Sequence, residues 1–421
     1  MKRIGVLLAA LIVSLTARAQ VRSISDLLAT AGSDPGVTQF QSLLGTASGL
    51  RMHDPLVRQV ALRIGFNGNS MGDSLLGYIR NEDAYRLQVG FNSFQERNRQ
   101  KDIKNARVGL LNAEYGLIQQ QAASRRIVAL TAWLYTLPAL EACRKLDTFL
   151  VREQAILREM LTSGVGDVKV SKVLDAEEDK SRNDRDIASL ESSVESARQS
   201  LVQLTGDFSG IDQSDLATVE DISLWLAEIK TALPATHPAV TAKNARIALE
   251  SANLDYISSQ NRRFVNNLSV GYQYPLFVET RNRFNPQNNF SFRIELLAPL
   301  PANNRFKRAD ALLDLREAQY EAAMTLESVS ISAEYQLASV ENLIREYNAI
   351  TDRIENGLIG KMLGNRTLHA SISPLDMVEL EIALQKMEVA RAELLADIGK
   401  EYAELLGLTG VQEAKYLLKK R

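Results

Sequence analysis

Strict alternation of apolar and polar residues predicts four β-strands, at residues 57–68, 84–94, 264–278 and 288–298. The apolar positions expected to share one face are Leu62, Ile64, Phe66, Leu87, Val89, Phe91, Val270, Tyr272, Phe292 and Ile294. Polar positions alternate with them, among them Arg63, Arg86, Arg293 and Glu295. Because successive side chains of a strand point to opposite faces, each strand has one apolar face and one polar face.

Apolar residues seven positions apart dominate the segments around the strands. Ile103, Leu110 and Leu117 show this spacing early in the chain, and Leu380, Met387 and Leu394 show it late. The spacing predicts coiled-coil helices. We expect long helices at about 99–163 and 303–356, each followed by a return helix, at about 167–205 and 374–407. Pro138 predicts a kink or a split in the first long helix, because proline lacks the backbone N–H that a helix uses.

This series of elements occurs twice. Residues 20–206 and 235–410 each read as helix, two strands, long helix, turn and return helix, and both end on Leu-Thr-Gly. A polar connector at 207–234 joins the two repeats, and a tail follows at 411–421. The sequence therefore predicts an α+β protein built from a duplicated helix, β-hairpin and helix unit.

An apolar sheet face needs a cover, which is either a helix of the same protein or lipid. We expect the coiled-coil helices to pair with one another, which leaves lipid as the cover. Transmembrane barrels have at least about eight strands, and open sheet edges are not tolerated in hydrocarbon. The four strands must therefore share a barrel with copies of the same chain, and three copies would supply twelve strands.

The first residues have the pattern of an export signal. Met1-Lys2-Arg3 precedes an apolar run at 4–15, and Ala17-Arg18-Ala19 provides small residues before Gln20. The apolar run falls short of the ~20 residues that a bilayer-spanning helix needs. We therefore expect a signal peptide at 1–19 that is cleaved before Gln20.

Composition excludes several classes of function. The formal net charge of −2 provides no basic field for nucleic acid. Cys143 is the only cysteine, so no intramolecular disulfide forms. The three histidines, His53, His237 and His369, lack metal-ligand spacing, and the chain has neither a catalytic triad pattern nor a phosphate-binding loop. We expect no enzymatic activity, no cofactor and no metal.

Three segments resemble the TolC-like outer-membrane efflux family. They are His237-Pro238-Ala239-Val240 with the alanines that follow, Ala298-Pro299-Leu300-Pro301 with Asn304-Arg305, and 373–395 leading to Leu405-Leu406-Gly407. The resemblance covers nearly all of the mature chain. It implies a homotrimer with a β-barrel in the outer-membrane lipid and a helical coiled-coil tunnel in the periplasm. It also implies a passive exit duct, for efflux or type I secretion, that receives substrates from an inner-membrane transporter through a periplasmic adaptor.

The resemblance also suggests site residues. In the family, turns between paired helices form the periplasmic end and dock the adaptor. The matching turns here are Gly164-Val165-Gly166 and Gly364-Asn365-Arg366, with 371–374 as an alternative for the second. Glycine in such a turn is also what any pair of helices requires.

The family often carries two carboxylates, one helical turn apart, at a closed periplasmic entrance. Asp376 and Glu379 match this spacing, and a solvated helix face is the alternative interpretation. Lys172 departs from the family, which often has an acid at this position in the first repeat.

Other functions remain as alternatives. A periplasmic coiled-coil protein without a pore would need no two-faced strands. A pump adaptor has long helical hairpins, but it is not built from two copies of this unit. The sequence does not specify the cargo, the transporter or the adaptor.

Overall fold

The computed structural model describes residues 23–50, 55, 57–70, 78–91, 94–163, 169–206, 211, 215–232, 237–260, 265–275, 289–296, 305–364, 372–410 and 413–420. The predicted signal peptide lies outside this part of the chain. The chain forms two compact units. Unit 1 contains Met1–Gln41, Tyr115–Pro238 and Leu326–Arg421, and unit 2 contains Ser42–Glu114 and Ala239–Thr325.

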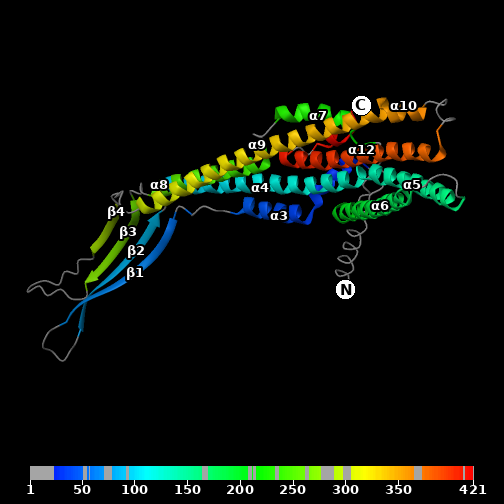
Figure 1. Cartoon of the computed structure of the whole chain (residues 1–421). Coiled ribbons are helices and arrows are strands. Elements are labelled where there is room, and N and C mark those ends of the chain that lie inside the picture. The colour runs from blue at the N-terminus through cyan, green and yellow to red at the C-terminus, as the bar shows by residue number, and fades with distance from the viewer. Residues whose placement is uncertain are drawn as a thin grey trace, which may run out of the picture. The chain divides into compact units, whose positions relative to one another are not determined.

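Unit 2 contains one antiparallel sheet in which the two repeats join. Its strands are β1 (Val57–Ser70), β2 (Tyr78–Phe91), β3 (Val265–Pro275) and β4 (Asn289–Leu296). The order in the sheet is β1-β2-β3-β4, so the pairing of β2 with β3 connects the first repeat to the second (Figure 1). β2 begins six residues earlier than the predicted position 84, because Tyr78 to Asp83 continue the ladder with β1.

The helices of unit 2 form a row in the same order as the strands (Figure 1). α3 (Pro35–Gly49) precedes β1, α4 (Phe94–Leu134) follows β2, α8 (Pro238–Gln260) precedes β3, and α9 (Arg305–Asn356) follows β4. Polar contacts join neighbours in this row: Lys104 Nζ donates to Ser48 O at 3.0 Å, Arg99 pairs with Asp255 at 3.1 Å, and Lys243 and Arg246 each pair with Glu321 at 2.8 Å. Each strand therefore adjoins one helix of the row in the chain.

Unit 1 is helical. It contains α2 (Ile24–Ala29), the short helix η1 (Thr30–Ser33), α5 (Leu137–Ser163), α6 (Val170–Thr205), α7 (Val219–Ala232), α10 (Leu358–Gly364), α12 (Pro374–Thr409) and the short helix η4 (Ala414–Leu417), with the adjoining parts of α3, α4, α8 and α9. Its largest core packs residues of α2, α4, α6, α7, α9 and α12, among them Leu27, Leu130, Ile222, Val340 and Tyr402. No helix in the described ranges is both long enough and apolar enough to cross a membrane.

Pro138 splits the first long helix. α4 ends at Leu134 and α5 begins at Leu137, so the break takes in the two residues before the helix resumes. Tyr135, inside the break, donates a hydrogen bond from its hydroxyl to Ala217 O at 2.7 Å. Its ring lies against Gly399 of α12, where a β-carbon would overlap the ring. The break thus lets one side chain join α12 and the segment before α7.

The C-terminal tail attaches to the connector between the repeats. Ala217 N donates to Leu417 O at 2.9 Å, and Lys419 N donates to Asp215 O at 3.1 Å. Tyr416 meets Trp225 of α7 in an edge-to-face contact with ring centroids 5.3 Å apart. These contacts hold α7 against the end of the second repeat.

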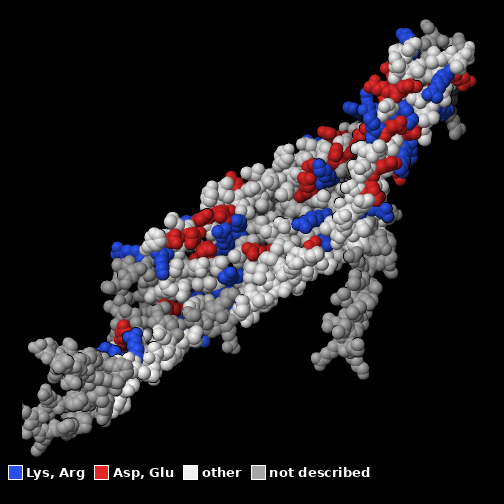
Figure 2. Space-filling model, turned by 90° about the horizontal axis from the view of Figure 1, so that it is seen from below, with Lys and Arg blue, Asp and Glu red and all other residues white. Residues whose placement is uncertain are grey.

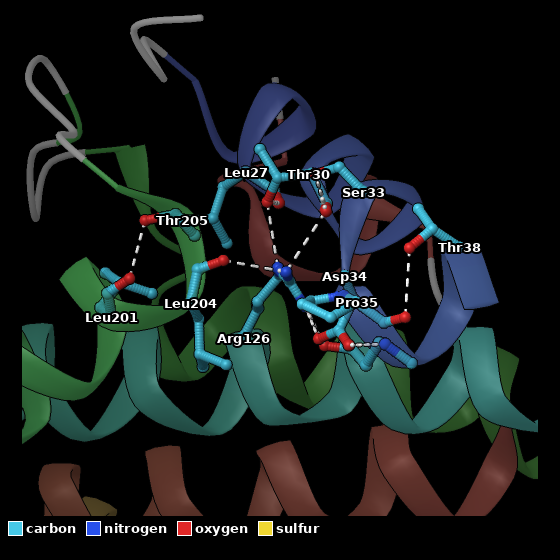
Figure 3. A network of polar contacts seen from close by, with 12 residues as sticks. Leu27, Thr30, Ser33, Asp34, Pro35, Thr38, Arg126, Leu201, Leu204 and Thr205 are labelled. Atoms are coloured by element: carbon cyan, nitrogen blue, oxygen red, sulfur yellow. Dashed lines mark hydrogen bonds and ion pairs between the residues drawn. The ribbon is translucent and has the colours of Figure 1, made fainter. Parts of the chain in front are cut away.

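A buried arginine connects the first described residues to α4 and α6 (Figure 3). Arg126 is only 1% exposed. Its guanidinium donates to Thr30 Oγ1 and O at 3.0 and 3.2 Å, to Ala122 O at 2.8 Å and to Leu204 O at 2.9 Å. Burial lowers the pKa of Arg126, and the Asp34 carboxylate, 3.6 Å away, opposes this shift. The hydrogen bonds compensate for the loss of water around the charge.

The contact between Tyr135 and Gly399 predicts an effect on stability. Gly399→Ala places a methyl group in the volume of the Tyr135 ring, and such overpacking typically costs ~1–3 kcal/mol. We expect a lower melting temperature for the purified protein in detergent. The control is Gly116→Ala in α4, where the added carbon meets nothing within 4 Å and alanine is favoured in a helix. Equal melting temperatures for the two variants would contradict this packing.

Candidate functional site

Apolar residues form continuous rows across all four strands. The register places Leu62 beside Leu87, Leu87 beside Val270, and Val270 beside Phe292. The neighbouring rows are Val60, Val89, Leu268 and Ile294, and Ile64, Tyr85, Tyr272 and Phe290. Because residues two apart in a strand share a face, the three rows form one apolar band.

This apolar band is open to its surroundings. Leu62 is 64% exposed and Phe292 is 65% exposed, values far above those of core residues. Val89, Phe91 and Tyr272 are half-buried by their neighbours within the sheet. Phe66 lies in β1, but its side chain is outside the described part. A contiguous exposed apolar surface of this kind marks a contact with lipid or another protein.

The opposite face of the sheet is polar. Arg63 lies beside Arg86, and the row continues through Gly271 to Ser291. The next row contains Ala61, Gln88, Ser269 and Arg293. Glu295 accepts a hydrogen bond from Asn267 Nδ2 at 2.6 Å.

The sheet has two open edges. β1 pairs only with β2 and β4 pairs only with β3 among the described strands, so one side of each has no strand partner. α3 and α9, which adjoin these strands in the chain, are the outer helices of the row. Strand edges and helix faces on both sides of unit 2 are thus available for a further chain.

The outer helices carry exposed apolar residues at heptad spacing. On α9 these are Phe306, Leu313 and Tyr320, and Phe306 is 82% exposed. On the α3 side, Leu43 and Leu50 are seven residues apart and about half exposed. α3 contains no charged residue, whereas an exposed helix usually has a charged outer face. Both surfaces have the pattern of a coiled-coil contact without its partner.

The two predicted entrance carboxylates each have a partner within the chain. Asp376 is in the first turn of α12, where its N–H donates to Ser373 Oγ at 3.1 Å and its carboxylate accepts from the same hydroxyl at 2.7 Å. This reciprocal contact is a helix cap. Glu379 pairs with Lys172 of α6 at 2.5 Å, and this hydrogen bond raises the pKa of Lys172. Lys172, which departs from the family pattern, therefore contacts one of the two predicted entrance carboxylates.

A second ion pair between α6 and α12 follows one heptad later. Asp179 pairs with Lys386 at 2.5 Å, so the sign of the charges is reversed relative to Lys172 and Glu379. Figure 2 shows both signs of charge mixed over the end of unit 1 that carries α5 and α6. In the described ranges, no three His, Cys, Asp or Glu side chains are grouped as metal ligands would be. The spacing of charged residues along the sequence did not predict these two ion pairs between α6 and α12.

The predicted adaptor-docking turns lie mostly outside the described part. Gly164, Val165, Gly166, Asn365 and Arg366 are outside it, and Gly364 is the last residue of α10. Ser163, which precedes the first turn, ends α5. The structure thus describes the helices that lead to both turns.

Several solved structures share this architecture. CusC, whose crystal structures concern folding and transmembrane channel formation, has a TM-score of 0.62 and 12% identity, covering 91% of each chain. The outer membrane protein VceC from Vibrio cholerae has a TM-score of 0.58 and 14% identity, covering 92% of this chain and 96% of that chain. The open-state outer membrane channel MtrE of Neisseria gonorrhoeae has a TM-score of 0.54 and 15% identity, covering 92% of this chain and 88% of that chain. The sequence matches no protein-family model and no curated protein.

These similarities establish a shared fold. They extend over more than nine-tenths of the chain and include both repeats, although only 12–15% of residues are identical. The resemblance indicated by the sequence is therefore confirmed at this level, and the chain has the fold of the TolC-like outer-membrane channel proteins.

Proposed function

We propose that this chain is the subunit of an outer-membrane channel, and that three copies form the channel together. The observation that carries the proposal is the exposed apolar band on the four-stranded sheet. Lipid is the cover that the band requires, and the polar face then lines a water-filled lumen. The subunit would be a passive duct located in the outer membrane, with its helices in the periplasm.

Strand length and open edges support a shared barrel. A tilted transmembrane strand needs about 9–11 residues, and β1, β2 and β3 have 14, 14 and 11, while β4 has 8 in its described range. One sheet with four strands is too small to close. Three copies of four strands make twelve, and β4 of each copy would pair with β1 of the next. No strand edge then meets hydrocarbon.

The same closure brings α9 of one copy beside α3 of the next. These helices adjoin β4 and β1, so their apolar stripes would meet wherever the strand edges pair. α3 leads into β1 and α9 leads away from β4, which makes the two helices antiparallel. Counting from the sheet, Leu50 would lie near Phe306 and Leu43 near Leu313. Twelve helices in three copies of this row would continue the barrel as a tunnel.

The periplasmic end would receive substrates from an inner-membrane transporter through an adaptor. The turns at 164–166 and 364–366 would be the docking sites, as the sequence resemblance to the family suggests. Asp376 and Glu379 would form an acidic entrance ring that Lys172 partly neutralises, because it pairs with Glu379 in the same chain. The cargo would pass without chemical change.

Charge substitutions separate the lipid face from the lumen face. An ion at mid-bilayer costs ~2–4 kcal/mol, so we expect Leu62→Arg and Phe292→Arg to reduce the amount of assembled trimer in outer-membrane fractions. Ala61→Arg and Ser291→Arg, on the neighbouring polar positions, serve as controls and should largely spare assembly. Equal losses on both faces would show that the sheet is not a membrane barrel.

Cysteine crosslinking tests the closure. In a Cys143→Ser background, Leu43→Cys with Leu313→Cys should give disulfide-linked dimers and trimers on oxidation, because the two positions belong to stripes that meet between copies. The control pairs Leu43→Cys with Ala318→Cys, since Ala318 is buried within its own chain and should not react. Trimers that form without crosslinking at the first pair would mean that other surfaces join the copies.

The acidic entrance predicts block by multivalent cations. Three copies of each carboxylate near the axis would attract a trivalent cation applied from the periplasmic side of a planar bilayer. We expect block of the wild type, weaker block after Asp376→Asn with Glu379→Gln, and stronger block after Lys172→Gln, which removes the compensating charge. If all three proteins are equally sensitive, the carboxylates belong to a solvated helix face and other residues form the entrance.

A further inference from the structure

The described side chains on the polar face of the sheet are mostly basic where they are charged, although the whole chain has a formal net charge of −2. Its described side chains include Arg63, Arg86 and Arg293, and the acid among them is Glu295, which accepts a hydrogen bond from Asn267. Among the described side chains of this face, three positive groups and one negative group leave an excess of two positive charges. The excess is local and does not follow from composition.

Two of these arginines directly oppose each other. Arg63 and Arg86 are cross-strand partners, and side chains in such positions start about 4.5–5.5 Å apart. Like charges in this arrangement repel. Neither guanidinium has a carboxylate partner among the side chains that the structure describes. A solvated polar face does not require two directly opposed cations. An anion bound between the two guanidinium groups would relieve their repulsion.

The other two residues of this row are small. Gly271 is the cross-strand partner of Arg86, and Ser291 is the partner of Gly271. A β-carbon at Gly271 would come within 2.5 Å of Ser291 Oγ, so a larger residue at this position would displace the Ser291 hydroxyl. A hydroxyl group and a glycine without a side chain thus lie in the same row as the two arginines.

We infer that the row formed by Arg63, Arg86, Gly271 and Ser291 is an anion-binding ring, and that the barrel favours cargo bearing phosphate or carboxylate groups. The inference rests on the proposed channel, because it needs the polar face to line a lumen. Guanidinium groups bind such oxyanions through paired N–H donors. With two arginines in the row of each copy, three copies bring six to one level of a confined lumen, where opposite charge is concentrated.

Anion block of the purified channel tests the ring. Pyrophosphate, applied to the barrel side of a planar bilayer, should reduce the wild-type current by occupying the arginines. Arg63→Gln with Arg86→Gln should require roughly tenfold more pyrophosphate for half block, because hydrogen bonds to charged groups are lost. The reversal potential in a potassium chloride gradient should also shift towards cation preference.

Two further variants control for charge and geometry. Arg308→Gln with Arg316→Gln removes the same two charges from exposed positions of α9 and should leave pyrophosphate block unchanged. Arg63→Lys with Arg86→Lys keeps the charge without the planar donor pair, so the anion preference should persist while pyrophosphate binds less tightly. Identical block in the wild type and in the Arg63→Gln, Arg86→Gln protein would overturn the inference.

Failure of the channel proposal gives a different result. A wild-type protein that conducts no ions contradicts the channel itself and does not depend on the arginines. Calorimetric titration of the same purified protein with pyrophosphate then decides the anion ring separately. Binding that is lost in the Arg63→Gln, Arg86→Gln protein supports it, and no binding to the wild type contradicts it.

Discussion

An unpaired strand edge beside an exposed apolar face is the constraint on which the rest of this structure depends. Backbone N–H and C=O groups need hydrogen-bond partners, and hydrocarbon supplies none. The sheet presents three apolar rows, and among the described strands β1 and β4 have no partner on their outer sides. A chain with both features is incomplete as a monomer in lipid, and other copies are the simplest source of the missing partners.

Duplication makes this constraint easier to satisfy. Each repeat contributes one hairpin, and the two hairpins join through β2 and β3. The helices beside the strands follow the same order, with α3 and α9 on the outside. Each element therefore pairs with the next one in the row within a copy, and in the proposed trimer the same rule would also describe the contacts between copies. The uncharged α3 and the apolar stripe of α9 agree with burial in such an assembly.

Charge is distributed differently at the sheet and at the return helices. On α6 and α12, opposite charges meet in pairs, as in Lys172 with Glu379 and Asp179 with Lys386. On the polar face of the sheet, Arg63 and Arg86 are cross-strand neighbours, and neither has a carboxylate partner among the described side chains. Paired charges align two helices and attract little from solution, whereas unpaired like charges attract a counterion. The ion pairs thus align α6 with α12, whereas the two arginines of the sheet remain available for a counterion.

The sequence by itself determined the period of each element, the two faces of the strands and the duplication. These features are local, because alternation along a strand and heptads along a helix are set by backbone geometry within a few residues. It also indicated the break at Pro138, but left a kink and a split as equal alternatives. Only the tertiary structure decided which apolar residues share a row, and that Lys172 reaches Glu379. It also decided that Tyr135 rests on Gly399 and that Arg126 joins Thr30 to Leu204. These contacts connect residues far apart in the chain, so they depend on the register between elements, and register is set by how side chains pack when the elements meet.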